Sequence, residues 1–239
     1  MQFPSLEQII AYGTGFYFTK VLLWICVSIA LFIVIKKQKR DRSYNTLLIY
    51  LILELALGLI DNFVSPNKYI QAKTKSYFTN FSNIIIANIE YYFFSTLHNR
   101  IFNNKYKNKS RLIIIFLLAL SVAIILYTYF VDIKPILRLT YLLGSLEFLF
   151  VFYLSVVYFL NIIDEVPRFD LFKKGSFWCF LGALFYCSVS APFYIVGPNF
   201  PSGNHTIDTL LPALLYYTPY SILFICISKG LVCKTPIWS

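Results

Sequence analysis

The sequence is poor in charge: only 13% of its 239 residues are Asp, Glu, Lys or Arg, whereas 58% are hydrophobic. Soluble domains carry about a quarter charged residues, so the composition excludes an ordinary soluble globular domain. The apolar residues also gather into runs of about 20 residues, which is the length that an α-helix needs to cross a bilayer. We therefore expect an integral membrane protein.

Metal-binding and disulfide-forming residues are also scarce. The two histidines, His98 and His205, fall on opposite predicted sides of the membrane, so no paired-histidine metal site is expected. No two of the five cysteines have CxxC spacing, and four lie inside apolar runs, where we interpret them as small packing residues. Neither a metal site, a disulfide framework nor a cofactor is therefore predicted.

Common catalytic motifs are missing as well. The chain contains no GxSxG, HExxH or P-loop sequence. We accordingly predict that the protein is not an enzyme, and we assign no catalytic residue.

What the chain does have is a series of apolar runs separated by polar or basic loops. They predict an all-α fold: a polytopic transmembrane helical bundle of seven spans that forms one domain over residues 1–239. The first run lacks the flanking features of a removable signal peptide, so we expect it to be retained. The fourth run is uncharged and is predicted to face lipid. The runs cover residues 16–35, 45–64, 77–98, 112–131, 137–163, 177–196 and 209–231.

Basic residues are distributed unevenly between the loops. With the loops assigned alternately to the two sides, 15 of the 21 Lys and Arg residues fall on one side, including a cluster at residues 36–42. Basic loops stay in the cytoplasm, so this bias predicts an N-terminus outside and a C-terminus inside a bacterial inner membrane. Because orientation explains the net charge of +10, the predicted partner is the lipid bilayer and not a nucleic acid.

Three glutamates interrupt the apolar runs: Glu54 in the second, Glu90 in the third and Glu147 in the fifth. A charged side chain at the membrane centre costs about 2.5–3.5 kcal/mol on insertion scales, so each should face the bundle interior or be protonated. At a rise of about 1.5 Å per residue, the three are predicted to share one layer. No Lys or Arg lies in the middle of a run, so the carboxylates lack an obvious counter-ion.

Helical spacing supports an inward-facing polar row around these glutamates. Asn83 precedes Glu90 by seven residues and shares its helix face, and glycines lie one turn from Glu54 and Glu147. Small residues of this kind let neighbouring helices approach closely. Two interpretations stay open: the carboxyl groups join helices as structural hydrogen bonds, or they bind a ligand, a proton or a cation.

The seventh run contains Pro212 and Pro219, close to several tyrosines. Each proline removes a backbone donor, which bends or loosens the helix and frees carbonyl groups. The tyrosines then either line a pocket that opens outward or pack around a tolerated bend, of which we favour the second. The predicted ligand- or proton-binding residues are Glu54, Asn83, Glu90, Glu147, Tyr186, Tyr216 and Tyr220.

The second half of the chain resembles a group of seven-span bacterial membrane proteins of the Bacteroidetes type. The similarity is carried by LEFLFVFYLSVVYFLNII at residues 146–163 and by FDLFKKGSFWCFLGALFYCSVSAPFYI at residues 169–195. The resemblance implies a membrane sensor module of the kind that is sometimes joined to a histidine kinase domain. The sequence ends soon after the seventh run, so we expect any output to pass through a partner. The matching positions are Glu147, Phe177, Trp178, Gly182 and Tyr186.

These observations predict an inner-membrane protein of sensor or receptor type that signals through a cytoplasmic protein. Two alternatives from other classes stay open. One is a small proton- or cation-coupled transporter or channel, in which the glutamates carry the ion; the other is a structural accessory subunit of a membrane complex. No heptad array or tandem repeat indicates an oligomeric state.

Overall fold

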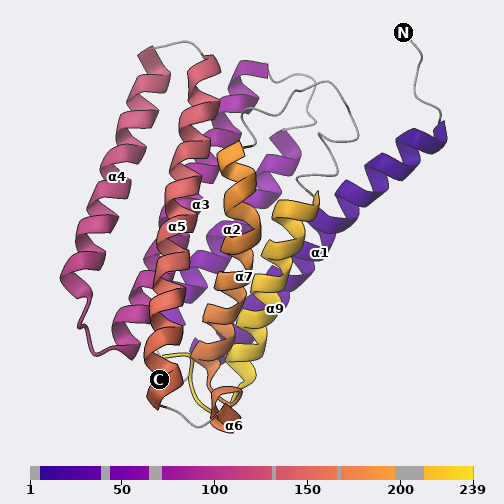
Figure 1. Ribbon diagram of the computed structural model, residues 1–239. Helices are drawn as coiled ribbons and strands as arrows, with labels where there is room; N and C mark the ends of the chain where they lie inside the picture. Colours follow the sequence, from indigo (N-terminus) through magenta and orange to yellow (C-terminus); the bar gives the residue numbers. More distant parts are fainter. Residues whose placement is uncertain are drawn as a thin grey trace.

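In a computed structural model, long α-helices run side by side along one axis (Figure 1). The structure describes residues 6–38, 44–64, 72–130, 133–165, 168–196 and 213–238. Over this part of the chain the only β-pairing is an isolated bridge between Lys174 and Thr235. The predicted all-α fold is therefore confirmed.

The described part of each predicted run is helical, and most helices extend a few residues beyond the run at one end or both. The additional residues continue the backbone hydrogen bonding past the apolar stretch, as expected for helices that project from a bilayer or tilt in it. The last run is divided into a π-helical turn and an α-helix. The elements are α1 (Leu6–Gln38), α2 (Asn45–Val64), α3 (Ala72–Ile101), α4 (Lys107–Phe130), α5 (Ile133–Glu165), α6 (Arg168–Leu171), α7 (Gly175–Val196), η3 (Ala213–Tyr217) and α9 (Thr218–Val232).

Five of the described helices are long and apolar enough to cross a membrane. They comprise parts of α1, α4, α5, α7 and the η3–α9 segment, and α2 contributes a shorter apolar helix over Asn45–Ile60. Helix α3 is long but more polar, since its 30 residues include Asn80, Asn83, Asn88 and Glu90. The apolar helices indicate a membrane-embedded protein.

Six helices form a closed ring in the order α1, α2, α3, α5, α7 and α9, in which α9 returns to pack against α1. We call the end of the bundle where α1 begins the upper end, and the opposite end the lower end, as they stand in Figure 1. Helices α3 and α5 descend beside each other from the upper end, so residues near their beginnings face the same region. The ring interior is therefore where side chains from six helices meet.

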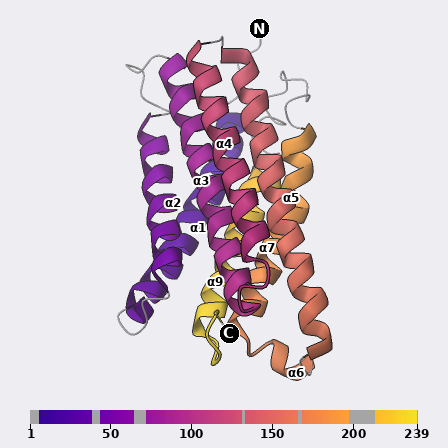
Figure 2. The ribbon, with the colours of Figure 1, turned by 90° about the vertical axis from the view of Figure 1, so that its left-hand side faces the viewer.

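Helix α4 lies outside the ring, against α3 and α5 (Figure 2). Only 22% of the membrane-length apolar segment of α4 is buried, compared with 50% of the corresponding segment of α5, as expected for the predicted lipid-facing helix. Its polar attachment comes from Asn88 of α3, whose Nδ2 donates to Ser121 Oγ at 2.7 Å. The turn before α4 contains Asn103 and Asn104, both at positive φ, a conformation that asparagine tolerates better than most residues.

Helices α7 and α9 approach each other closely at their glycines. A Cβ atom on Gly182 would lie 2.7 Å from Cys226 Cβ, and one on Gly230 would lie 2.5 Å from the carbonyl oxygen of Gly175. No real side chain fits at such distances, so glycine is required for this crossing. Small residues at a helix interface favour packing in lipid because backbones can then make extensive van der Waals contact.

The segment after α9 folds back under the lower end of the ring. Thr235 Oγ1 donates to the Lys173 carbonyl at 2.7 Å, which ties the segment to the turn before α7. Ile237 is fully buried, and the ring of Trp238 contacts Phe93 of α3 at 6.2 Å between centroids. Arg100 lies over the Trp238 ring at 4.5 Å. The residues from Cys233 to Trp238, which we call the C-terminal cap, thus close the lower end.

Candidate functional site

The three membrane glutamates all point into the ring. Glu90 and Glu147 are 1% and 2% exposed, and Glu54 is 8% exposed. Glu90 lies near enough to both of the others for direct electrostatic interaction. The structure therefore brings together the three carboxyl groups that depth alone predicted to share a layer.

Glu90 and Glu147 line the same small cavity between α3, α5, α7 and η3. Its volume is about 30 Å³, which is space for one or two water-sized species. Asn83 and Thr140 contribute polar side chains at the upper part, and we call this space the first cavity. Its aromatic wall is formed by Phe148, Tyr186, Tyr194 and Tyr216.

Glu54 lines a second cavity of about 80 Å³ between α1, α2, α3 and η3. Lys20 of α1 lies on the wall of this second cavity, with its Nζ atom 5.5 Å from the centroid of the Tyr217 ring. Lys20 thus lines the same cavity as Glu54, although it lies near the start of its predicted run and not in the middle.

Asn83, Ile86 and Tyr216 line both cavities, which are therefore adjacent. Asn83 is exposed, unlike Glu90 on the same helix face. We interpret its position as the mouth at which both cavities reach the surface in the upper half of the bundle. The predicted polar row on α3 thus begins at the surface with Asn83 and ends in the interior with Glu90.

Each glutamate has one buried carboxyl oxygen without a protein hydrogen-bond partner: Oε2 of Glu54, and Oε1 of Glu90 and of Glu147. A buried polar atom left without a partner costs about 1–3 kcal/mol, and more when it is charged. A proton, a water molecule or a bound ion would each satisfy such an oxygen, so the structural and the binding interpretation of the glutamates both stay open.

The predicted tyrosines form a continuous cluster beside the glutamates. The ring centroids of Tyr186 and Tyr220 are 4.7 Å apart with nearly parallel planes, and Tyr216 lies 5.5 Å from Tyr220. The Tyr220 hydroxyl lies close to the carboxyl groups of Glu54 and Glu90. Tyr186 and Tyr216 line the first cavity, whereas Tyr220 reaches the site through its hydroxyl group.

Pro219 explains the irregular start of the last helix. It has no N–H group to bond the carbonyl of Leu215 four residues earlier, and the chain there forms the π-helical turn η3. Ser190 of α7 donates to that Leu215 carbonyl at 2.8 Å. A neighbouring helix thus donates to the freed carbonyl, as expected if the proline causes a tolerated bend. Tyr216, on the same turn, still lines the cavities. Pro212 and His205 lie outside the described residues.

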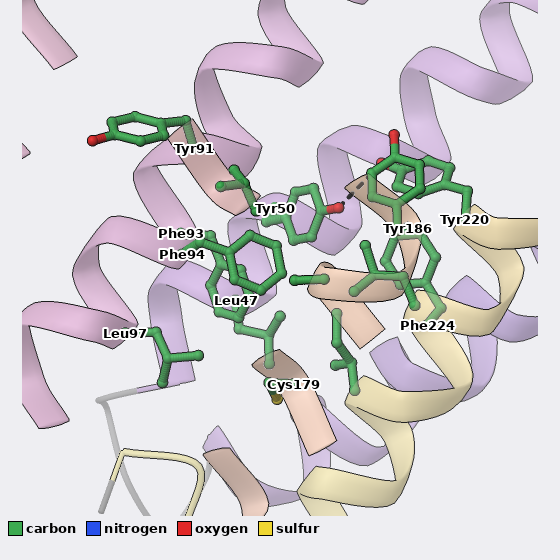
Figure 3. Close-up of a cluster of buried hydrophobic side chains, with 14 of the residues drawn as sticks. Leu47, Tyr50, Tyr91, Phe93, Phe94, Leu97, Cys179, Tyr186, Tyr220 and Phe224 are labelled. Carbon is green, nitrogen blue, oxygen red and sulfur yellow. Dashed lines mark hydrogen bonds between the residues drawn. The ribbon is translucent and has the colours of Figure 1, made fainter. Parts of the chain in front are cut away.

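A fully buried aromatic layer lies one helical turn below the glutamates (Figure 3). Tyr50 of α2 stacks on Phe93 at 5.5 Å and on Phe224 at 5.9 Å between ring centroids. Phe94 and Phe180 fill the adjoining space at 6.1 Å from each other. Among the described residues, this layer fills the interior of the ring between the two cavities and the lower end.

Sequence reasoning missed two residues of the site besides Lys20. Tyr194 follows Ser190 by four residues and Tyr186 by eight, so the three side chains lie on one face of α7. This helical spacing could have predicted that Tyr194 lines the first cavity. Trp238 follows the last apolar run without any periodic pattern, and its contact with Phe93 has no signal in the sequence.

The positions that carry the sequence resemblance have different structural roles. Glu147 and Tyr186 line the first cavity, and Gly182 forms the close α7–α9 crossing. Phe177 and Trp178 lie at the lower end, where Trp178 Nε1 donates to the Phe172 carbonyl at 2.9 Å. Only two of the five positions therefore belong to the site.

No metal-binding cluster of three or more His, Cys, Asp or Glu residues occurs among the described residues. No known protein family, curated protein or solved structure matches the chain.

Proposed function

We propose that the protein is a receptor-type membrane protein with seven spans, its N-terminus outside and its C-terminus inside the cytoplasmic membrane. The upper end would then face the exterior and the basic lower end the cytoplasm, in accordance with loop charge. The glutamate cavities receive the signal, and a cytoplasmic partner receives the output. This orientation places the mouth at Asn83 on the outer side.

A column of contacts that joins the cavities to the C-terminal cap supports this proposal. The Tyr220 hydroxyl is placed between the glutamates and Tyr50, and it lies 3.1 Å from the Tyr50 hydroxyl. Tyr50 stacks on Phe93, and Phe93 contacts Trp238. Binding that moves Tyr220 would therefore change the packing of the cap through only three successive contacts.

The aromatic layer favours a receptor over a channel. A channel requires a polar path from one side to the other, whereas Phe93, Phe94 and Phe224 fill the interior with no exposed surface. Packed side chains with alternative arrangements are the physical basis by which two distant sites become coupled. A receptor needs such a layer to transmit a change without passing an ion.

The test uses the fluorescence of Trp238 in a full-length chain that carries Trp24→Phe and Trp178→Phe, since the protein has three tryptophans. Neutralising the cavity by Glu90→Gln should change the quenching of Trp238 by iodide. An added Phe93→Leu should abolish that change by interrupting the column. Ile115→Ala on the exposed face of α4 is the control and should leave quenching unaltered. Identical quenching in the parent and the Glu90→Gln chain would overturn the receptor proposal.

The transporter alternative is favoured by one observation, the interrupted helix at η3, because broken helices that line a polar cavity are common at transporter substrate sites. Reconstitution into liposomes separates the two functions. Uptake of sodium ions or protons that disappears in Glu147→Gln would assign transport to the cavity. Absence of flux, together with a response of Trp238, supports the receptor.

A further inference from the structure

The two cavities differ in their charge balance. The second cavity contains one carboxylate, Glu54, and has Lys20 on its wall. The first cavity contains two carboxylates, Glu90 and Glu147, and no Lys, Arg or His lines it. The two carboxyl groups of the first cavity therefore share it without a basic side chain in its lining.

We infer that the first cavity is a binding site for one small monovalent cation, an alkali-metal ion or an ammonium ion of similar size, held between Glu90 and Glu147. The inference rests on the proposed receptor function, because it names the class of ligand that the receptor would take. It concerns the first cavity alone.

The two carboxyl groups that would hold the cation line the cavity together. Oε1 of Glu90 and Oε1 of Glu147 are buried and have no protein partner, although both side chains line the cavity. Two carboxylates in one buried space repel each other unless a proton or a cation lies between them. A bound cation satisfies both oxygens and removes the repulsion, whereas a neutral ligand would leave the repulsion in place.

The size of the cavity selects the ligand. A volume of about 30 Å³ admits an ion or one or two water-sized species but excludes a drug-sized molecule. A divalent ion such as Mg²⁺ dehydrates reluctantly and keeps several waters, for which a cavity of this volume has no room, whereas a monovalent ion gives up its waters more easily. The aromatic wall adds π faces, which attract alkali-metal and ammonium cations alike.

Access to the site is consistent with this ligand. Asn83 is exposed and lines the first cavity, so a hydrated cation can enter at its amide oxygen before it reaches the carboxylates. The aromatic layer below Glu90 prevents onward movement through the described interior. The geometry therefore supports reversible binding from the upper end.

The test measures thermal unfolding of the purified full chain in chloride salts of lithium, sodium, potassium, ammonium and choline at equal ionic strength. We expect a concentration-dependent rise in Tm with at least one small cation and none with choline, which is too large for the cavity. A rise with sodium or lithium alone identifies an alkali-metal ion, and a rise with ammonium alone identifies an ammonium ligand. Equal Tm values in all salts would overturn the inference.

Matched variants locate the effect. Glu90→Gln and Glu147→Gln should weaken the apparent affinity about ten- to a hundredfold, as expected for loss of one charged contact. Glu54→Gln removes a carboxylate that acts on Glu90 only from the neighbouring cavity, so it should weaken the affinity less than either of these two substitutions. A response lost equally in all three variants contradicts a site in the first cavity.

A chemical measurement on the unmodified chain covers the case in which the variants do not fold. Dicyclohexylcarbodiimide modifies buried carboxyl groups, and mass spectrometry assigns the modified residue. A small cation should slow the labelling of Glu90 and Glu147, whereas choline should not; labelling at one rate in every salt contradicts the inference. Neither measurement involves Trp238. If the cation binds but the quenching of Trp238 does not change in Glu90→Gln, only the receptor proposal is refuted. If the quenching changes but no cation binds, only this inference is refuted.

Discussion

The hydroxyl groups of Tyr50 and Tyr220 lie 3.1 Å apart, and this hydrogen bond joins α2 to α9 at the level where the cavities end and the aromatic layer begins. Both side chains are almost completely buried, with exposures of 1% and 0%. The Tyr220 hydroxyl also faces Glu54 and Glu90. The pair is therefore the only polar contact in the column between the carboxyl groups and Trp238 in the part of the chain that the structure describes.

Replacing Tyr50 by Phe should remove this hydrogen bond while preserving the ring stacking on Phe93. We expect a loss of about 1 kcal/mol in the free energy of unfolding, measured by detergent denaturation. Tyr158→Phe is the control, because Tyr158 makes a similar buried bond of 3.0 Å to Ser176 away from the cavities. Both variants should lose similar stability, but only Tyr50→Phe should abolish the response of Trp238 to Glu90→Gln. A response retained in Tyr50→Phe would remove this bond from the column.

Ser190→Ala should destabilise the protein, because it leaves the Leu215 carbonyl without its donor next to Pro219. The expected loss is about 1–3 kcal/mol, the cost of an unsatisfied buried acceptor. Ser188→Ala on the same helix is the control, since the exposed Ser188 bonds only the Leu184 carbonyl of its own helix. Equal unfolding curves for the two variants would show that Ser190 does not support the η3 turn.

Gly182→Ala should separate α7 from α9. The added Cβ would lie 2.7 Å from Cys226 Cβ and 3.2 Å from the Leu223 backbone, so one helix must move. We expect a loss of about 1–3 kcal/mol and a lower Tm. Gly58→Ala serves for comparison, because its Cβ would meet only Trp24 Nε1 at 3.3 Å, on a side chain that can shift. The close crossing is disproved if Gly182→Ala is as stable as Gly58→Ala.

The helices and the inward direction of the glutamates were predictable from sequence. Apolar runs of membrane length form helices because backbone groups in lipid must bond within their own segment. Glu90 and Glu147 face the ring because a carboxylate in lipid is costly, and the uncharged α4 faces outward for the complementary reason. These features depend on local composition, which a single sequence contains.

The neighbours of each helix were not predictable in this way. Lys20 lines the second cavity together with Glu54 only because α1 packs between α2 and α9. Trp238 closes the lower end because the chain turns back after α9, and its contact with Phe93 spans most of the sequence. Such contacts depend on how the helices cross, and the periodic spacing of residues within one run does not predict how that helix crosses its neighbours.

The closure of the ring by α1 against α9 has a consequence for biosynthesis. The first helix enters the membrane long before its final neighbour has been synthesised, so the gap between α1 and α7 stays open until α9 arrives. During that interval the inward faces of α2, α3 and α5 carry their carboxyl groups without the Tyr220 hydroxyl that later faces them. A membrane insertase or chaperone that shields a half-finished bundle would therefore be needed most between the insertion of α5 and that of α9.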